Sequence, residues 1–289
     1  MDMEDKAKKK HDYIVKNIQY TQEGIPKIIH QTWKNENIPE KWILSKEQWM
    51  KTHEDWQYIL WTDEDIMNHI KTFHEDYYDF FLNLEYKIQM VDAIRYFILY
   101  DYGGIYCDLD LYPKKNIEKY ILGNLDHFVY EAGKNNSIVN AFMISPGKTF
   151  LMKEIYENLK KTEIPWFCFG KHLKVMYSTG PNFLYNILLN TKYPFIIIPR
   201  MLFYPYSSSE DKIINEKEEE IVIYPIKNSS GSWHSIDSYI YSIVNKYKSL
   251  FIFIGIMSII LIIFLAIYYF VKLKECKKSK GQCERKCKI

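Results

Sequence analysis

The segment from Tyr86 to Tyr112 constrains the fold most, because a helical pattern and an alternating pattern meet in it at a double glycine. Residues 86–100 (YKIQMVDAIRYFILY) are mostly apolar and lack Pro and Gly, which predicts a buried helix that is capped near Gly103. Residues 105–112 (IYCDLDLY) alternate between apolar and polar or amphipathic side chains, which is typical of a half-buried strand. The segment therefore predicts a helix that turns tightly into a strand.

Two aspartates on the predicted strand, Asp108 and Asp110, are separated by one residue. On a strand they point the same way, roughly 7 Å apart along the backbone, and they repel each other unless a cation lies between them. Mg²⁺ and Mn²⁺ bind carboxylate oxygens and keep positions for phosphate oxygens. The pair therefore indicates metal-assisted handling of a phosphorylated substrate, although an isolated Asp-x-Asp is more often a solvated pair that closes a strand.

The predicted helix carries two opposite charges three residues apart, Asp92 and Arg95, which share one face of the helix. Charges in an otherwise apolar helix are costly to bury unless they are paired or serve a function. From the helix alone, a structural ion pair and a functional pair remain equally open.

Residues 90–113 (MVDAIRYFILYDYGGIYCDLDLYP) resemble the core of glycosyltransferase family 32, of the mannosyl-inositol-phosphoceramide-synthase type. The family pattern is, in outline, SDxxRYxxLYxxGGxYxDxDxxP, and the chain departs from it at Val91, where Ser is common. The sugar-transferring domains of large clostridial toxins share a looser form of this motif. The resemblance implies an α/β fold with the GT-A architecture of nucleotide-diphospho-sugar transferases. It also implies retaining transfer of a hexose, with mannose as the first candidate, from a nucleotide sugar to a glycolipid or glycan hydroxyl.

Further segments match the same family in the same order along the chain. Ile25–Trp33 (IPKIIHQTW) matches the opening IPKxIHQxW, and Gly231–His234 (GSWH) resembles the element that closes over the leaving diphosphate. Ser178–Phe183 (STGPNF) resembles the TGP element, which opens a helix; its backbone N–H groups either face the acceptor or only begin that helix.

The resemblance implies roles for residues in these segments. The implied catalytic residues are Asp92, Arg95, Asp108 and Asp110. Asp110 would bind Mn²⁺ or Mg²⁺ directly, Asp108 would hold the donor and the metal's water shell, and Arg95 and Asp92 would position the donor sugar and phosphate. The candidate metal ligands are Asp108, Asp110 and His234, and the candidate donor-binding residues are Thr32, Trp33, Tyr106, Asn140, Ser232, Trp233 and His234. His30 is more simply interpreted as a satisfied strand histidine.

Outside these segments the chain alternates strand and helix patterns. Trp56–Trp61 (WQYILW) is typical of a strand, and Thr62 is a good N-cap for a helix whose first turn holds acids. Such alternation predicts an α/β sheet, in which nucleotides bind at loops that leave the carboxyl ends of the strands.

Composition excludes two classes of protein. Hydrophobic residues make up 47% and charged residues 26% of the 289 residues, so the chain is not a disordered one. Residues 272–289 carry a net charge of +6, and since the whole chain carries +2, residues 1–271 carry −4. A mildly acidic body argues against nucleic acid as a partner. The five cysteines form neither a disulfide framework nor a metal-binding spacing.

Residues 250–271 are uncharged and lie between Lys248 and Lys272, and at 1.5 Å per residue they span roughly 33 Å, enough for a bilayer. We therefore expect a polar, mobile arm over residues 1–24, a GT-A domain over residues 25–245, a transmembrane helix over residues 250–271 and a basic, cysteine-containing tail over residues 272–289. The expected location is a single-pass protein of a Golgi- or ER-type membrane or a virus-associated membrane. The basic tail favours a cytosolic C-terminus, whereas the lack of an N-terminal signal favours a cytosolic domain, so the side of the domain stays open.

Two alternatives to a sugar transferase remain. Another metal-dependent enzyme that handles phosphate would also need paired aspartates, and would usually need a third carboxylate or several histidines nearby. A non-catalytic membrane or virion surface protein could keep the fold, but it would be expected to lose Asp110 or Arg95, and both are present. The expected partners are a nucleotide-sugar donor, a lipid or glycan acceptor and the bilayer.

Overall fold

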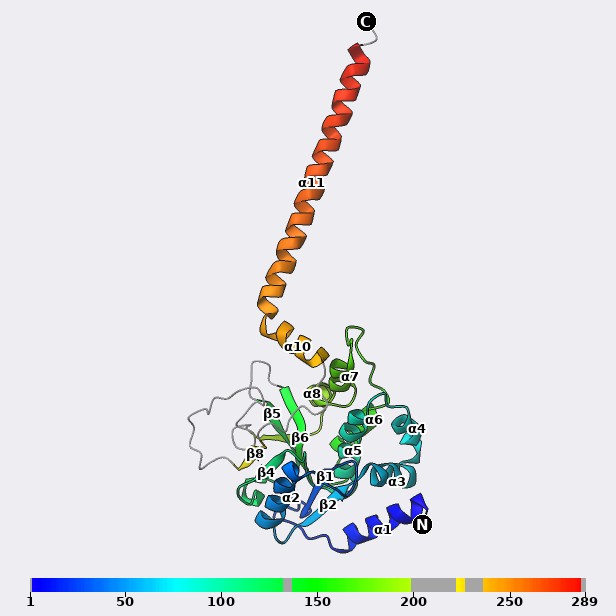
Figure 1. Cartoon of the computed structure of the whole chain (residues 1–289), viewed down its shortest axis with the longest axis vertical. Helices are drawn as coiled ribbons and strands as arrows, with labels where there is room; N and C mark the ends of the chain where they lie inside the picture. The colour runs from blue at the N-terminus through cyan, green and yellow to red at the C-terminus, as the bar shows by residue number, and fades with distance from the viewer. Residues whose placement is uncertain (1, 132–136, 199–221, 227–235, 287–289) are drawn as a thin grey trace. The chain divides into compact units, whose positions relative to one another are not determined.

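The computed structural model of the chain describes residues 2–131, 137–198, 222–226 and 236–286 (Figure 1). The helices of the first part are α1 (Met3–Lys16), α2 (Glu40–Thr52), α3 (Asp63–Phe73), α4 (Tyr78–Leu82), α5 (Lys87–Tyr102), α6 (Phe150–Asn158), α7 (Lys171–Ser178) and α8 (Pro181–Asn190), with short 3₁₀ helices at Glu75–Tyr77 and Glu118–Tyr120. The strands are β1 (Ile28–Thr32), β2 (Gln57–Trp61), β3 (Gly104–Cys107), β4 (Leu111–Pro113), β5 (Asp126–Glu131), β6 (Ser137–Ser145), β7 (Phe195–Ile198) and β8 (Ile223–Pro225). Helices α10 (Ile236–Lys246) and α11 (Lys248–Lys286) follow.

Six strands form one mixed sheet in the order β2-β1-β3-β6-β5-β7. Strand β1 is parallel to both β2 and β3, β6 is antiparallel to β3 and β5, and β7 is parallel to β5. One apolar core joins the sheet to α3, α5, α6 and α8, and a second contains Trp49 of α2 and strands β4 and β8. Helices therefore pack near a mixed sheet on both sides, as the predicted α/β class requires.

The local signals for helix ends are borne out by the backbone. The Thr62 hydroxyl accepts a hydrogen bond from the Asp65 N–H, and the Asp65 carboxylate accepts one from the Thr62 N–H, so a capping box begins α3. Helix α5 ends at Tyr102 with Gly103 as its C-cap, and Gly104 follows with φ of +86°. A Cβ at Gly104 would lie 2.4 Å from the carbonyl oxygen of Ile28, so the double glycine lets β3 start directly against β1.

The predicted continuous strand over residues 105–112 is wrong, because the chain turns within it. Strand β3 ends at Cys107, the Leu111 N–H donates to the Asp108 carbonyl oxygen at 3.0 Å, and β4 begins at Leu111. Strand β4 leaves the main sheet and pairs with β8. Asp108 and Asp110 therefore lie on a turn between two sheets, and not two residues apart on one pleated face.

The prediction of a mobile arm over residues 1–24 is also corrected. Residues 3–16 form α1, in which the Ile14 side chain is fully buried. Lys10 forms an ion pair with Asp65 of α3 at 2.7 Å and donates to the Leu60 carbonyl oxygen at 2.7 Å. Helix α1 packs against the domain with few apolar residues because its lysines form ion pairs with the acidic first turn of α3.

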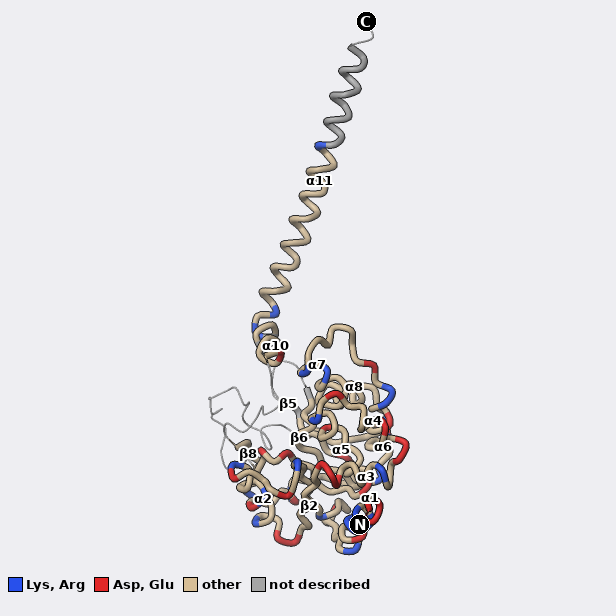
Figure 2. The backbone as a smooth tube through the Cα atoms, turned by 45° about the vertical axis from the view of Figure 1, so that its right-hand side comes forward, with Lys and Arg blue, Asp and Glu red and all other residues tan. Residues whose placement is uncertain are grey.

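The chain divides into two compact units, Met1–Trp233 and His234–Ile289. In the second unit, Lys248–Lys272 of α11 is long and apolar enough to cross a membrane and is a candidate span. Figure 2 shows this stretch as a tan run that is bounded by lysines.

Candidate active site

Helix α5 presents Arg95 to a buried polar cluster beneath the Asp108–Asp110 turn. The Arg95 guanidinium lies 2.8 Å from an Asp92 carboxylate oxygen and 3.4 Å from one of Asp108. It donates to the carbonyl oxygen of Asn140 on β6 at 2.5 Å and lies 4.6 Å from the ring centroid of Tyr106. The side chain of Arg95 is almost completely buried, so the guanidinium is fixed by all four groups.

Strands β1 and β3 hold the Asp108 carboxylate from its other side. The Tyr106 hydroxyl donates to Asp108 Oδ1 at 2.8 Å and lies 3.1 Å from the Thr32 hydroxyl. Because Tyr106 gives its proton to the carboxylate, Thr32 must donate to Tyr106. Thr32, Tyr106 and Arg95 together therefore set the position of Asp108, which remains one-third exposed.

Burial first and the charge of Asp108 second raise the pKa of Asp110 to about 7. No ion pair from the described part of the chain reaches the Asp110 carboxylate, although Arg95 attracts it weakly. If Asp92, Asp108 and Asp110 are all ionised, one guanidinium faces three carboxylates. This excess of negative charge on carboxylate oxygens fits a divalent cation, and Asp108 and Asp110 are the residues that would hold it.

Asp92 of α5 lies beside β6 and the start of α8, and the sequence did not predict that these three elements meet. Its Oδ1 accepts from the Asn140 side-chain amide at 3.1 Å. A Cβ on Gly180 would lie 3.3 Å from its Oδ2, and the Thr179 carbonyl oxygen accepts from the Tyr96 hydroxyl at 2.8 Å. Burial raises the pKa of Asp92 to about 6, with the Arg95 charge opposing the rise. The TGP element therefore begins α8 directly beside Asp92.

A second set of residues holds the turn from α2, β1 and β2, and Ser45, Trp49 and Tyr58 among them were not predicted as site residues. Ser45 and Trp49 of α2 both donate to the Leu111 carbonyl oxygen, at 2.5 and 3.1 Å. The Gln31 side-chain amide lies 2.9 Å from the Ser45 hydroxyl and 3.2 Å from Cys107 Sγ, and its oxygen accepts from the Tyr58 hydroxyl at 2.7 Å. Three consecutive polar side chains in the predicted first strand, His30, Gln31 and Thr32, were the available signal for this network.

The remaining predicted residues divide into three groups. His30 is fully buried, is bonded to the Gly103 carbonyl oxygen at 2.9 Å and has its pKa lowered to about 3 by burial, so it is the satisfied strand histidine of the simpler interpretation. Trp33 follows β1, packs edge-on against Trp42 at 4.5 Å and is half-buried. The last group lies outside the described residues: Ser232, Trp233 and His234.

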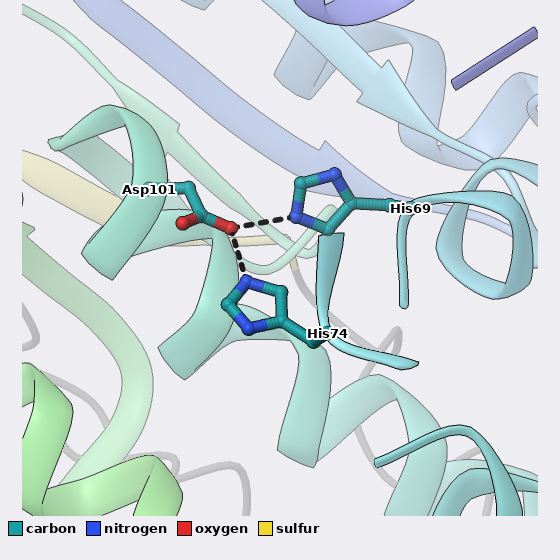
Figure 3. A group of neighbouring side chains, drawn as sticks. All are labelled: His69, His74 and Asp101. Carbon is teal, nitrogen blue, oxygen red and sulfur yellow. Dashed lines mark hydrogen bonds and ion pairs between the residues drawn. The ribbon is translucent and has the colours of Figure 1, made fainter. Parts of the chain in front are cut away.

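A different group of possible metal ligands lies where α3 ends beside the end of α5 (Figure 3). One Asp101 oxygen accepts from His69 Nε2 at 2.8 Å and from His74 Nε2 at 2.6 Å, and Lys148 reaches the other oxygen at 2.7 Å. A metal with bonds of about 2.1 Å in tetrahedral geometry holds its ligand atoms about 3.4 Å apart. These shorter contacts are those of hydrogen bonds, so the cluster joins two helices without requiring an ion.

A cavity of about 690 Å³ opens along α1 and the edge strand β2, and none of the predicted site residues lines it. Its lining includes Lys6, Lys9, Lys34 and Lys46. The turn that carries Asp108 and Asp110 is therefore separate from this cavity.

Comparison with known proteins identifies the family of the chain. A family model described as the glycosyltransferase sugar-binding region containing a DXD motif matches residues 39–127. The chain is 31% identical to inositol phosphoceramide mannosyltransferase 1 of Schizosaccharomyces pombe over 252 residues, which cover 85% of this chain and 73% of that protein. Inositol phosphoceramide mannosyltransferase 3 of the same organism is 30% identical over 262 residues, with 86% and 67% covered. The chain belongs to this family of DXD-containing glycosyltransferases.

Family membership confirms the resemblance drawn from residues 90–113 and with it the predicted class, an α/β nucleotide-sugar transferase domain with a C-terminal candidate membrane span. Among solved structures, the PaToxG glycosyltransferase is similar with a TM-score of 0.42 and 18% sequence identity, over 64% of this chain and 76% of that one. The part of the glycosyltransferase matched by the family model runs from α2 into β5 and includes the Asp108–Asp110 turn.

Proposed function

We propose that this glycosyltransferase moves a hexose, with mannose as the first candidate, from a nucleotide-sugar donor to a hydroxyl of a membrane lipid headgroup. The observation that carries the proposal is the buried Arg95, which links Asp92 and Asp108 beside a further, partly buried carboxylate, Asp110. Relatives named inositol phosphoceramide mannosyltransferases support mannose and a lipid acceptor. A glycan acceptor is the alternative within the same reaction.

Asp108 and Asp110 are proposed to hold Mn²⁺ or Mg²⁺, with His234 as a further ligand from the part of the chain outside the described residues. A divalent ion at this position supplies positive charge to the diphosphate as it leaves. The chain's own contribution is to fix the two carboxylates, which Tyr106, Thr32 and Arg95 do at Asp108. Electrostatics that are fixed before the reaction contribute most where charge develops in the transition state.

Asp92, Arg95 and Asn140 are proposed to orient the donor sugar, since they form one buried cluster next to the turn. The nucleotide would lie toward the carboxyl end of β1, with Trp33 against the base, Asp108 toward the ribose or sugar, and Ser232 and Trp233 against the diphosphate. The buried Tyr106 and Thr32 would act on the donor through Asp108. No carboxylate in the described residues is an evident covalent nucleophile. We therefore propose retention by front-face attack: the acceptor oxygen bonds to the anomeric carbon, the bond to the diphosphate oxygen breaks, and the leaving phosphate takes the acceptor's proton.

The proposed membrane anchor is the candidate span of α11, in a Golgi- or ER-type membrane or a virus-associated membrane. The proposed domain limits remain residues 25–245 for the transferase and 272–289 for the basic tail, although α1 is itself part of the first unit. An anchored enzyme meets a lipid acceptor in two dimensions, which suits a substrate that never leaves the bilayer.

The test uses the full chain in nanodiscs with Mn²⁺ and a panel of nucleotide sugars, and measures release of nucleoside diphosphate and transfer to lipid. Asp110→Asn is the test variant. Asp55→Asn is the matched control, because Asp55 pairs with Lys27 before β2, at the edge of the sheet away from the turn. Release with one donor that is lost in Asp110→Asn and kept in Asp55→Asn supports the proposal, and product stereochemistry by NMR tests retention. Silence with every donor, together with no Mn²⁺-dependent nucleotide binding, would favour a non-catalytic protein that retains the fold.

A further inference from the structure

An exposed aromatic loop, residues 162–170 (TEIPWFCFG), connects α6 to α7 and is not used by the proposed chemistry. Trp166 is 85% exposed and Phe169 is 72% exposed, while the other tryptophans of the described residues are buried or half-buried. Ile164 and Phe167 of the same loop are also exposed. Four large apolar side chains in such a short loop form a patch, whereas singly exposed ones are ordinary on a protein surface.

The loop has a defined conformation that holds these side chains outward. The Cys168 N–H donates to the Pro165 carbonyl oxygen at 2.9 Å, and the Thr162 N–H donates to the Asn158 carbonyl oxygen at 3.0 Å. Cys168 itself is buried and fixes the inner side of the loop. The aromatic rings contact one another edge-on, with centroids of Trp166 and Phe169 6.5 Å apart. The patch therefore belongs to a loop whose conformation is fixed by hydrogen bonds and by the buried Cys168.

Lysines flank the patch on both sides. Lys161 precedes the loop and Lys171 begins α7, with Glu163 as the acid within the loop, whereas the Lys160 ammonium donates to the Asp76 carbonyl oxygen. Figure 2 shows the connection between α6 and α7 as a projecting arch with basic residues at both ends. Tryptophan and phenylalanine with neighbouring lysines are the combination that favours the interface of a bilayer, where the rings meet acyl chains and the ammonium groups meet anionic headgroups.

The length of the connection to the candidate span α11 limits how far the first unit can lie from a bilayer. Strand β8 ends at Pro225 and α11 begins at Lys248, and 22 residues separate them, half of which form α10. Such a connection spans at most about 55 Å. A domain of this size has a comparable diameter. The first unit therefore stays within about one diameter of any bilayer that α11 spans.

We propose that residues 162–170 insert into the interface of the bilayer that α11 spans, and set the depth and orientation of the active site over its lipid acceptor. Helix α7 starts where the loop ends and is 8 residues long, about 12 Å. At its far end Ser178 accepts from Gln89 of α5 at 2.8 Å, and Gly180 lies against Asp92. Loop insertion would hold Asp92 about one headgroup layer above the acyl chains, where the sugar hydroxyls of a lipid are presented. This inference rests on the proposed membrane anchoring and lipid acceptor.

The first measurement needs no catalysis. The full chain is reconstituted in vesicles that contain anionic lipid and lipids brominated near the headgroup, and tryptophan quenching is compared between wild type and Trp166→Phe. The fluorescence that the wild type has and Trp166→Phe lacks comes from Trp166, and we expect the brominated lipids to quench this part of the fluorescence strongly. Equal quenching of wild type and Trp166→Phe would overturn the proposal, because Trp166 would then stay in water or under another protein.

The second measurement separates insertion from catalysis. We expect Trp166→Ala/Phe169→Ala to raise the apparent KM for a membrane-embedded acceptor lipid about tenfold or more, with nucleotide-sugar hydrolysis by water unchanged. The matched control is Phe150→Ala, since Phe150 is also 72% exposed but lies outside the loop on α6, and its acceptor KM should not change. An unchanged KM in the loop variant, or the same rise in the control, refutes the role of the loop. If the wild type transfers no sugar while Trp166 is quenched by lipid, the proposed function fails and the insertion stands.

Discussion

Removal of the Arg95 guanidinium should destabilise the protein in a way that depends on pH. Arg95→Met deletes the ion pair with the buried Asp92 and the donor to the Asn140 carbonyl oxygen, while it keeps most of the side-chain volume. Loss of one partner of a buried ion pair costs about 3–5 kcal/mol. For a domain of this size each kcal/mol lowers Tm by about 2–4 °C, so we expect a fall of about 10 °C at neutral pH.

The pH dependence follows from Asp92. Burial already raises the pKa of Asp92 to about 6 against the attraction of Arg95, so loss of the guanidinium raises that pKa further. A carboxyl group whose pKa is higher in the folded than in the unfolded state costs stability as pH rises toward and through its folded pKa. A further rise of two pKa units corresponds to about 2.7 kcal/mol of destabilisation. We expect the variant to show this destabilisation at pH 8 and hardly any of it at pH 5.5, where Asp92 is protonated in the variant.

The assay is urea unfolding of wild type and variant at pH 5.5 and 8, followed by intrinsic fluorescence. Asp92→Asn in the Arg95→Met background should restore about 2–3 kcal/mol at pH 8, because it removes the unpaired charge. Arg95→Lys is the control that keeps a cation without the planar fork. An equal loss at both pH values, with additive effects of the two substitutions, would mean that packing and not charge accounts for the effect.

Four further results are expected. Asp110→Asn should raise the Tm of the metal-free protein at pH 8, since the raised pKa of that carboxyl costs stability as pH rises from about 4 through 7, and should abolish the Tm increase that Mn²⁺ gives wild type; a Mn²⁺ shift of unchanged size would contradict the assigned ligand. Asp101→Asn should cost about 2–3 kcal/mol at pH 7 and less at pH 3, because hydrogen bonds from both histidines, acting against burial, hold the pKa of Asp101 well below its usual range, and stability from a lowered pKa is lost as pH falls below about 4; a loss independent of pH in urea unfolding would argue otherwise. Ile14→Ala should cost about 2–5 kcal/mol in the same assay and expose α1 to limited proteolysis, and an unaltered Tm would mean that α1 does not dock. Gly104→Ala should cost more than about 2 kcal/mol, because φ is positive there and the added Cβ would lie 2.4 Å from the Ile28 carbonyl oxygen; a stable and active variant would show that the strands can separate.

Much of the fold could be predicted where the signal is local. Thr62 begins α3 through contacts with a residue three positions away, and the apolar run of α5 is buried whatever surrounds it. The candidate span of α11 needs only its own length and composition. Arg95 and Asp92 could be paired from sequence because three residues along a helix place side chains on one face.

The predictions were wrong where the structure of a segment depends on contacts with segments far away in the sequence. Alternation in residues 105–112 fits one strand equally well as it fits two strands joined by a turn, since Leu109 is buried in either case. Strand β4 leaves the main sheet because β8, more than 100 residues later, pairs with it. Likewise α1 looked mobile because its few apolar residues give no periodic signal, and its docking depends on the acids of α3.

The family, the charged residues near the Asp108–Asp110 turn and the apolar span could be predicted from sequence, because each is a property of neighbours along the chain. The contacts of Asp92 with Asn140 and Gly180, and the exposure of an aromatic loop one short helix away, could be seen only once the chain was folded. These encounters depend on strand pairing and on packing between segments that are far apart in sequence, and local periodicity carries no record of which distant segment a buried side chain will meet.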